Sequence, residues 1–368
     1  MAFSEVKRKF GFGAMRMKMN GDEIDLDEFS KMIDRFIGAG FNYFDTAHGY
    51  IKGKSELAIG ECLCARYKRE DFVLANKLSE WYLEREEDII PYFEEQLKAC
   101  RVDYFDFYLC HGVDRENYQK YKQIRAFEVI SKLKEEGRVK HLAISFHDTA
   151  DVLDMILTEQ PAIEAVQLQI NYLDYDDPAI QSRACYDVAV KHGKPVMVME
   201  PIKGGTLVNL PEKAAAVIDS LGGGSPASYA LRYAASHPAV FMVLSGMGNM
   251  DMVEENIRTM GDFKPLDEKE EAALAEVRQI IRDSRQIGCT GCNYCAEVCP
   301  RDIKISDMFA LVNQVNAAKI TKAEAKANMP AEGHAADCIA CGACERVCPQ
   351  DIEIREKLAD IAKKYKRG

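Results

Sequence analysis

The sequence predicts an α/β fold: a (β/α)8 TIM barrel followed by a small, mainly α-helical domain. Through most of the chain, short apolar runs typical of strands alternate with amphipathic stretches typical of helices. Eight such strand–helix pairs without a long interruption indicate a closed parallel barrel rather than an open sheet. Near the C-terminus, eight of the thirteen cysteines fall in two tight clusters, which is typical of a metal-binding domain in a reducing compartment.

The predicted strands are apolar runs that end in turn residues or polar residues. They lie at 9–15, 41–45, 72–77, 105–110, 139–145, 164–169, 195–199 and 240–244. The predicted helices lie near 27–38, 54–67, 87–100, 123–136, 149–158, 178–192, 226–236 and 251–259. The segment 206–224, which ends in three glycines, is predicted as a long loop, either a flexible lid or an ordinary surface loop.

The composition bounds the class of protein. We expect the barrel over residues 1–262, a charged connecting helix over 263–286 and the second domain over 287–368. With 47% hydrophobic residues the chain can bury a large core, and a net charge of −11 argues against nucleic acid or an anionic membrane surface as the main partner. The sequence shows no apolar run of membrane-spanning length and no signal-peptide pattern, so we expect a cytoplasmic protein.

Four chemically reactive side chains follow the ends of three successive predicted strands. They are Asp45, Tyr50, Lys77 and His111. In a parallel barrel these strand ends converge on one mouth, where such barrels carry out their chemistry. An ammonium group lowers the pKa of a nearby phenol, so Tyr50 is a candidate proton donor near neutral pH. The pattern predicts a site that reduces a carbonyl group.

These four residues resemble the Asp-Tyr-Lys-His tetrad of the aldo-keto reductases, and the resemblance covers roughly residues 9–260. It implies that Tyr50 is the general acid, that Lys77 and Asp45 tune it, and that His111 orients the carbonyl. It also implies that NAD(H) or NADP(H) supplies the hydride. The predicted activity is therefore carbonyl reduction or alcohol oxidation on a small molecule.

Two glycine-rich loops after the last two barrel strands predict a phosphate site. Glycines let backbone amides approach a phosphate, and the helix that opens at Asp251 favours anions at its N-terminus. The resemblance adds Ser145 and Gln167 as contacts of the nicotinamide carboxamide, and Glu255 and Asn256 as contacts of adenine. The full predicted cofactor set is Ser145, Gln167, Ile202, Gly204, Gly205, Ser245, Gly246, Glu255 and Asn256.

The sequence departs from the family pattern at several of these places. Phe146 stands where the family commonly has Asn, and Met199 or Glu200 replaces the aromatic residue that stacks on the nicotinamide. The loop over 245–256 contains no basic residue to hold a 2′-phosphate. We therefore expect NADH rather than NADPH, or a weakened nicotinamide site.

Three further side chains near the mouth each allow two interpretations. Lys203 is either a pyrophosphate contact or a solvated surface lysine. Trp81 either forms a wall of the substrate site or belongs to a surface cluster. His147 either reaches the mouth beside Ser145 or caps a helix.

The cysteine clusters are two copies of C-x2-C-x2-C-x3-C-P, the pattern of bacterial two-cluster ferredoxins. In that pattern the fourth cysteine of each run binds the other cluster. One predicted [4Fe–4S] ligand set is therefore Cys289, Cys292, Cys295 and Cys348, and the other is Cys338, Cys341, Cys344 and Cys299. If the long connection between the runs prevents this exchange, Cys299 and Cys348 trade clusters. A zinc site, which needs only four thiolates, fits the duplicated pattern poorly.

Combining a nicotinamide with these clusters raises a chemical question, because a hydride carries two electrons and a cluster moves one at a time. The sequence leaves several answers open: a bound flavin such as FMN between them, an external ferredoxin or other carrier that feeds a substrate without nicotinamide, or an electron-transfer or redox-sensing protein on a barrel scaffold. A purely structural role of the clusters is a further alternative.

Overall fold

The computed structural model describes residues 2–284, 286–317 and 319–366. The chain forms two compact units that are interleaved in sequence. Unit 1 comprises Met1–Pro201 and Leu231–Pro265, and unit 2 comprises Ile202–Ala230 and Leu266–Gly368. The sequence analysis divides the chain into three consecutive segments, 1–262, 263–286 and 287–368. The units differ from this division mainly at residues 202–230, which belong to unit 2.

Unit 1 contains a closed eight-stranded barrel in which every strand pair is parallel. The strand order around the barrel is β1-β10-β9-β8-β7-β6-β5-β4. The strands are β1 Phe10–Gly13, β4 Tyr43–Asp45, β5 Val73–Leu78, β6 Phe105–Val113, β7 Val139–Phe146, β8 Ala165–Gln169, β9 Val196–Met199 and β10 Val240–Gly246. All eight predicted strands and the barrel topology are thus confirmed. A short hairpin of β2 Met19–Asn20 and β3 Glu23–Ile24 follows β1.

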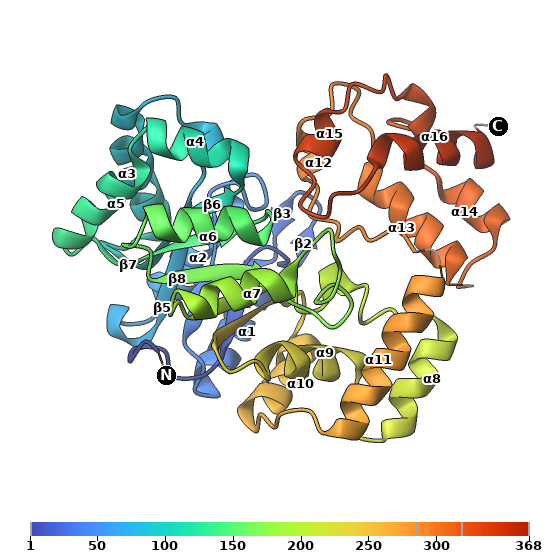
Figure 1. Cartoon of the computed structure of the whole chain (residues 1–368), viewed down its shortest axis with the longest axis horizontal. Coiled ribbons are helices and arrows are strands. Elements are labelled where there is room, and N and C mark those ends of the chain that lie inside the picture. Colours follow the sequence, from blue (N-terminus) through green and yellow to red (C-terminus); the bar gives the residue numbers. More distant parts are fainter. Residues whose placement is uncertain (1, 285, 318, 367–368) are drawn as a thin grey trace. The chain divides into compact units, whose positions relative to one another are not determined.

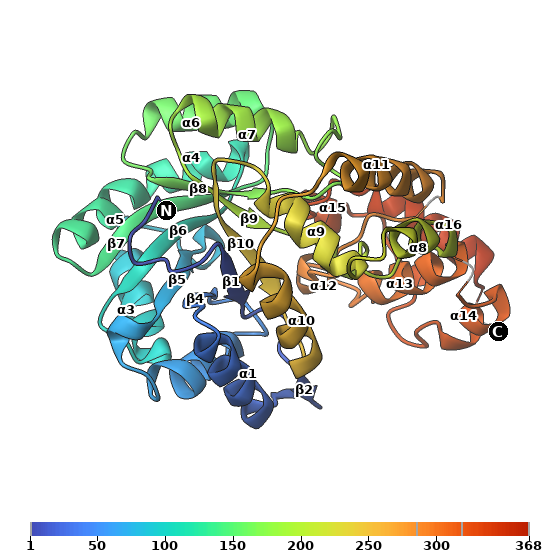
Figure 2. The same cartoon turned by 90° about the horizontal axis from the view of Figure 1, so that it is seen from below.

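Helices surround the strands of unit 1, as the ring of α1, α3, α5, α6 and α7 in Figure 2 shows. The helices are α1 Leu26–Gly38, α2 Lys54–Ile59, α3 Ile89–Cys100, α4 Arg115–Gln123, α5 Ala126–Glu135, α6 Ala150–Glu159, α7 Ser182–Lys191 and α10 Met250–Gly261. Helix α9, Pro226–Ala235, begins in unit 2 and ends in unit 1. The sequence analysis missed α4, because this mostly polar helix buries only Tyr118 and Tyr121 and so lacks a clear apolar stripe.

The bottom of the barrel is closed by the N-terminal segment. The ring of Phe3 lies 4.9 Å from that of Phe107 and 4.8 Å from that of Phe241, between ring centroids. Inside the barrel, side chains such as Tyr43 and Met197 join the same buried cluster. This packing leaves the opposite end, where β4, β5 and β6 end, for polar side chains.

Helix α2 continues into a π-helical turn, Gly60–Cys64, that lies very close to α3. A Cβ atom on Gly60 would lie only 2.3 Å from the carbonyl oxygen of Ala99. The close approach therefore requires glycine at this position.

Unit 2 is helical throughout its described secondary structure, which confirms the predicted mainly α-helical second domain. Its helices are α8 Glu212–Leu221, α11 Glu268–Asp283, α12 Tyr294–Glu297, α13 Ile305–Asn316, α14 Lys322–Asn328, α15 Ala343–Arg346 and α16 Ile354–Lys364. Figure 1 shows α8 and α11 side by side, and their residues are in contact. The prediction of a loop over 206–224 is wrong where α8 forms. This helix buries only Ala214 and Ile218 and is stabilised by a partner distant in sequence.

Among the described residues, no helix is both long and apolar enough to cross a membrane.

We predict that Gly60→Ala lowers the stability of the full-length protein by about 1–3 kcal/mol, because the added methyl group forces α2 and α3 apart. Thermal unfolding followed by circular dichroism measures the loss. Gly38→Ala is the matched control, since Gly38 ends α1 and a Cβ there meets no atom within 4 Å. Equal unfolding temperatures for the two variants would contradict the packing argument.

Candidate active site and cluster-binding motifs

The core of the candidate active site is a buried ion pair between neighbouring strands. Asp45 ends β4 and Lys77 lies near the end of β5. Lys77 Nζ lies 2.6 Å from Asp45 Oδ1 and donates a second hydrogen bond of 2.8 Å to the carbonyl oxygen of Thr46. Asp45 is 4% exposed and Lys77 is 0% exposed, so bulk water does not screen their attraction.

Tyr50 and His111 complete the group. Tyr50 lies in the turn after β4, and the centroid of its ring is 5.0 Å from Lys77 Nζ. His111 is part of β6, and its ring centroid lies 6.0 Å from that of Tyr50. The structure therefore brings together the four side chains that the sequence singled out as catalytic candidates.

Burial and charge act in opposite directions on the ion pair. Burial raises the pKa of Asp45, and it lowers the pKa of Lys77. In each case the charge of the partner and the hydrogen bond between them oppose the shift. Asp45 Oδ2 has no hydrogen-bond partner within the described part of the chain, although it is buried. The carboxylate thus depends on Lys77 for its compensation.

His111 is held in the neutral state. Burial lowers its pKa well below the usual value, and the charges of Lys77 and His147 act in the same direction. Its Nδ1 atom lies 2.8 Å from Ser79 Oγ. When the Ser79 hydroxyl donates to Nδ1, the ring proton is on Nε2, and Nε2 is then a hydrogen-bond donor.

Trp81 lies beside His111. The ring centroid of Trp81 is 5.0 Å from that of His111, and the tryptophan is 46% exposed. Burial lowers the pKa of His147 to about 4. The contact with His111 supports a place for Trp81 at the mouth, and Trp81 also packs on the exposed Tyr82, at 5.9 Å between ring centroids. Both interpretations of His147 stay predictions.

Glu56 is a supporting residue that the sequence analysis missed. It is 1% exposed, and its Oε1 accepts hydrogen bonds from Asn76 Nδ2 at 2.8 Å and Gln96 Nε2 at 3.0 Å. Gln96 Nε2 also donates to the carbonyl oxygen of Lys77. The negative charge of Glu56 raises the pKa of Lys77. A glutamate on a short helix is usually solvated, so only the packing of α2 against α3 reveals this role.

Several predicted cofactor residues lie in unit 1. Ser145 on β7 and Gln167 on β8 are register partners, and both are buried. Ser145 Oγ lies 3.9 Å from Met199 Sδ. Ser245, Gly246, Glu255 and Asn256 belong to β10 and α10. Whether these residues contact a dinucleotide stays a prediction.

Arg16 is a cation that the sequence analysis did not connect with this region. It follows β1, yet a Cβ on Gly246 would lie 2.6 Å from Arg16 Cγ. The Arg16 side chain therefore packs against the loop 245–256, which itself contains no basic residue. The parallel pairing of β1 with β10 brings the two loops together, and no local sequence signal indicates it.

Ile202, Gly204 and Gly205 belong to unit 2. A Cβ on Gly204 would lie 2.1 Å from the carbonyl oxygen of Thr290, so glycine is needed here for contact with the first cysteine run. Lys203 is 4% exposed, and its Nζ donates a 2.8 Å hydrogen bond to Gln350 Oε1. Lys203 is therefore not the solvated surface lysine of one interpretation. Contact of this segment with a phosphate stays a prediction.

The two cysteine runs have the same backbone conformation. In the first run the N–H of Gly291 donates to Cys289 Sγ at 3.4 Å, and in the second the N–H of Ala340 donates to Cys338 Sγ at 3.4 Å. The positive φ angles repeat as well, at Gly291, Asn293 and Asp302 and again at Ala340, Gly342 and Asp351. Backbone N–H groups directed at sulfur are suited to thiolates bound to iron.

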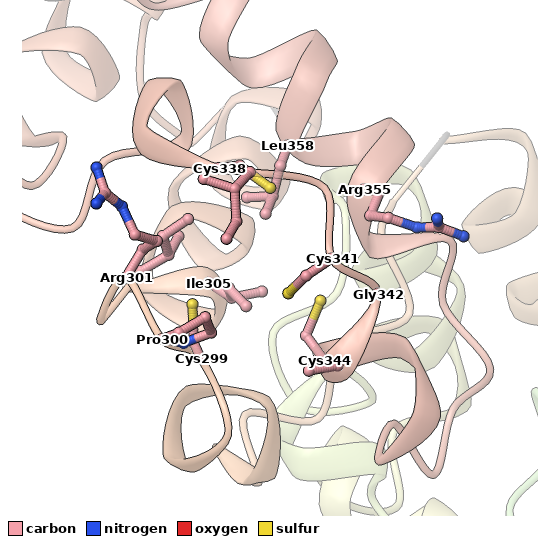
Figure 3. A pocket seen from close by; sticks show the side chains of 13 residues that line it. Cys299, Pro300, Arg301, Ile305, Cys338, Cys341, Gly342, Cys344, Arg355 and Leu358 are labelled. Carbon is pink, nitrogen blue, oxygen red and sulfur yellow. The ribbon is translucent and has the colours of Figure 1, made fainter.

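Cysteines from both runs line one cavity. They are Cys299 from the first run and Cys338, Cys341 and Cys344 from the second. In Figure 3 the sulfur atoms of Cys341 and Cys344 lie close together, across the cavity from Cys299. This is the set expected when the two runs exchange their fourth cysteine, so the lining fits a [4Fe–4S] cluster.

The other predicted set is gathered around Cys295. Burial raises the pKa of Cys295 to about 12, and the charges of Cys292, Cys289, Cys348 and Cys344 add to the shift. Cysteines of both runs, Cys348 among them, pack in one cluster with Cys295, as an exchange of the fourth cysteines requires. Within the described residues, no three His, Cys, Asp or Glu side chains are placed to hold a single metal ion. Each cysteine of a [4Fe–4S] cluster binds a different iron, so this finding is compatible with clusters.

The chain belongs to the aldo/keto reductase family, whose model matches residues 9–279. A second family model, the 4Fe-4S dicluster domain, matches residues 288–353. The protein is therefore an oxidoreductase of the aldo/keto reductase family that carries a C-terminal iron–sulfur domain, as the sequence predicted.

Three similar proteins each match about 70% of the chain. An uncharacterised oxidoreductase of Bacillus subtilis, YqkF, is 23% identical in an alignment of 283 residues that covers 68% of this chain and 88% of YqkF. The holo structure of aldo-keto reductase AKR11C1 from Bacillus halodurans matches with a TM-score of 0.60 and 26% identity, over 73% of this chain and 91% of that chain. An aldo-keto reductase from Klebsiella pneumoniae, solved in complex with NADPH, matches with a TM-score of 0.60 and 19% identity, over 73% and 90% of the two chains.

The depressed pKa of His147 predicts an acid-sensitive barrel. Between pH 6.5 and about 4 the unfolded chain takes up a proton at His147 that the folded chain does not. The free energy of unfolding contributed by this residue is therefore complete above pH 6.5 and falls as the pH drops towards 4, by at most about 3 kcal/mol. Urea unfolding at several pH values should show a shallower pH dependence for His147→Gln than for the wild type. Identical slopes would contradict the assignment.

Proposed function

We propose that the protein reduces a carbonyl group, or oxidises the corresponding alcohol, at Asp45, Tyr50, Lys77 and His111. The observation that carries the proposal is the position of Lys77 Nζ, which is 2.6 Å from Asp45 Oδ1 and 5.0 Å from the centroid of the Tyr50 ring. A buried cation at this place stabilises the phenolate that Tyr50 becomes when it donates its proton.

Each residue has one role in this proposal. Tyr50 donates its hydroxyl proton to the carbonyl oxygen of the substrate, and Lys77 lowers the cost of that transfer. Asp45 holds the ammonium group in place. Neutral His111 donates a hydrogen bond from Nε2 to the same carbonyl oxygen while Ser79 occupies Nδ1, which orients the substrate for attack.

A nicotinamide dinucleotide would supply the hydride when bound. The predicted contacts are Ser145 and Gln167 at the carboxamide, Ser245, Gly246, Glu255 and Asn256 on the β10 side, and Ile202, Gly204 and Gly205 after β9. We favour NADH over NADPH on the composition of the loop 245–256. The packing of Arg16 on Gly246 is the observation in favour of NADPH, and the Klebsiella pneumoniae protein was solved with NADPH.

We propose that the eight cysteines of the two runs hold two [4Fe–4S] clusters, with Cys348 completing the first set and Cys299 the second. The cavity lined by Cys299, Cys338, Cys341 and Cys344 supports the second set. Iron–sulfur clusters transfer single electrons, so we propose that a one-electron carrier such as an external ferredoxin exchanges electrons with this domain. No observation supports a bound FMN, and the proposal does not include one.

Replacement of Tyr50 tests the catalytic assignment. We expect Tyr50→Phe to lower kcat for reduction of 4-nitrobenzaldehyde, a generic carbonyl probe, by about 10²- to 10⁴-fold, because the proton donor is lost. Tyr67→Phe is the matched control, since the Tyr67 hydroxyl donates to Asp34 in an exposed contact. Unchanged activity and pH profile of Tyr50→Phe would refute the role of Tyr50.

A redox titration tests the link between the two chemistries. Anaerobically purified protein is titrated with NADH and with NADPH while visible and EPR spectra are recorded, and dithionite defines full reduction. If a nicotinamide provides the electrons for the clusters, it should bleach their absorbance in the presence of the substrate couple. Bleaching by dithionite alone would favour an external low-potential carrier, and clusters that dithionite does not reduce would favour a purely structural role.

A further inference from the structure

The two cysteine runs are repeats, yet their surroundings differ at one equivalent position. Thr290 follows the first cysteine of the first run and is 3% exposed, whereas Ile339 follows the first cysteine of the second run and is 59% exposed. The first run is therefore covered where the second is open to solvent.

The cover of the first run is the segment that follows β9. Gly204 lies against Thr290, so closely that a Cβ would be 2.1 Å from its carbonyl oxygen. The Lys203 side chain lies over Gly288, whose Cβ would be 3.5 Å from Lys203 Cε and 3.8 Å from Lys203 Nζ. All of these residues belong to unit 2.

Lys203 contacts residues next to cysteines of both runs that belong to the first predicted ligand set. Gly288 directly precedes Cys289, and Gln350, which accepts the hydrogen bond from Lys203 Nζ, lies two residues after Cys348. Lys203 also has a φ angle of +46°, a backbone region that non-glycine residues rarely adopt. The surrounding structure therefore holds this lysine in an unfavourable conformation, with its buried ammonium group beside the cysteine loop.

We infer that Lys203 is a positioning residue that raises the reduction potential of the cluster bound by Cys289, Cys292, Cys295 and Cys348. This inference rests on the proposed ligand sets. One-electron reduction adds a negative charge to a cluster, and removal of solvent around the first run makes that charge costly. A buried ammonium group beside the loop stabilises the added charge and offsets this cost.

The second site has no equivalent buried cation among the described residues that line it. Arg301 and Arg355 line its cavity, and in Figure 3 the guanidinium group of Arg301 points away from the cysteines. The guanidinium group of Arg355 does lie beside the second run, since a Cβ on Gly342 would be 3.7 Å from Arg355 Cζ. Arg355 pairs with Glu345, and its side chain is 53% exposed. Water and the carboxylate of Glu345 screen the charge of Arg355. Lys203 is buried and lies beside Gly288 of the first run, so its effect should be on the first cluster.

A mediated redox titration followed by EPR tests the inference, with dithionite as the reductant of both clusters. Lys203→Met keeps the length of the side chain and removes its charge. We expect the equilibrium constant for reduction of one cluster to fall at least tenfold, which corresponds to about 59 mV for one electron, and the other cluster to keep its potential. Lys203→Arg should restore the potential.

Two further variants complete the design. Cys341→Ser replaces a proposed ligand of the second cluster and identifies the signal of that cluster, because the signal should change or disappear. Gln350→Glu retains Lys203 but places a carboxylate beside the Lys203 ammonium group, so it should lower the potential of the first cluster, as Lys203→Met should. It therefore tests the inference even if the Lys203→Met protein fails to hold the first cluster. Unchanged potentials in both Lys203→Met and Gln350→Glu would overturn the inference. A shift in either variant of the signal that Cys341→Ser assigns to the second cluster would overturn it as well. Iron analysis that finds no clusters in the wild type would instead refute the proposed ligand sets.

Discussion

The buried pair of Lys77 and Asp45 is the interaction on which the rest of the active site depends. Two charges in the barrel interior are stable only when each is compensated, and removing one partner of such a pair typically costs about 3–5 kcal/mol. The pairing of β4 with β5 sets the position of both side chains. The Thr46 carbonyl group accepts the second hydrogen bond of Lys77. Hydrogen bonds among Glu56, Asn76 and Gln96, and from Gln96 to the Lys77 carbonyl oxygen, hold β5 in place. The ion pair and its supporting hydrogen bonds are therefore in place without a bound substrate.

The second constraint is the path of the chain between β9 and β10. After Pro201 the chain joins unit 2 for residues 202–230 and then returns to the barrel. In an uninterrupted barrel this connection would consist of one loop and one helix. Here it supplies α8, which packs against α11, and it supplies Lys203 and Gly204, which pack on the first cysteine run. The iron–sulfur unit is thus built partly from a barrel connection and is not simply attached at the end of the chain.

Local patterns predicted much of this protein correctly. Each of the eight strands was recognisable because its buried residues form a short apolar run between turns, and each cysteine run was recognisable because its spacing suits an iron–sulfur cluster. Helices α4 and α8 were missed because they bury only two residues each. Arg16 was missed because the loop that it contacts is brought close only by barrel closure.

The sequence by itself determined the barrel, its catalytic candidates and the cysteine runs, because strand periodicity and ligand spacing are local properties of the chain. Only the tertiary structure decided where Glu56, Arg16 and Lys203 act, because the atoms that they contact come from distant segments. From the sequence, a glutamate or lysine in a polar stretch is expected to be solvated. Only packing in the folded chain removes the water around it. Burial, which makes a charge strong or costly, is a property of the folded chain alone.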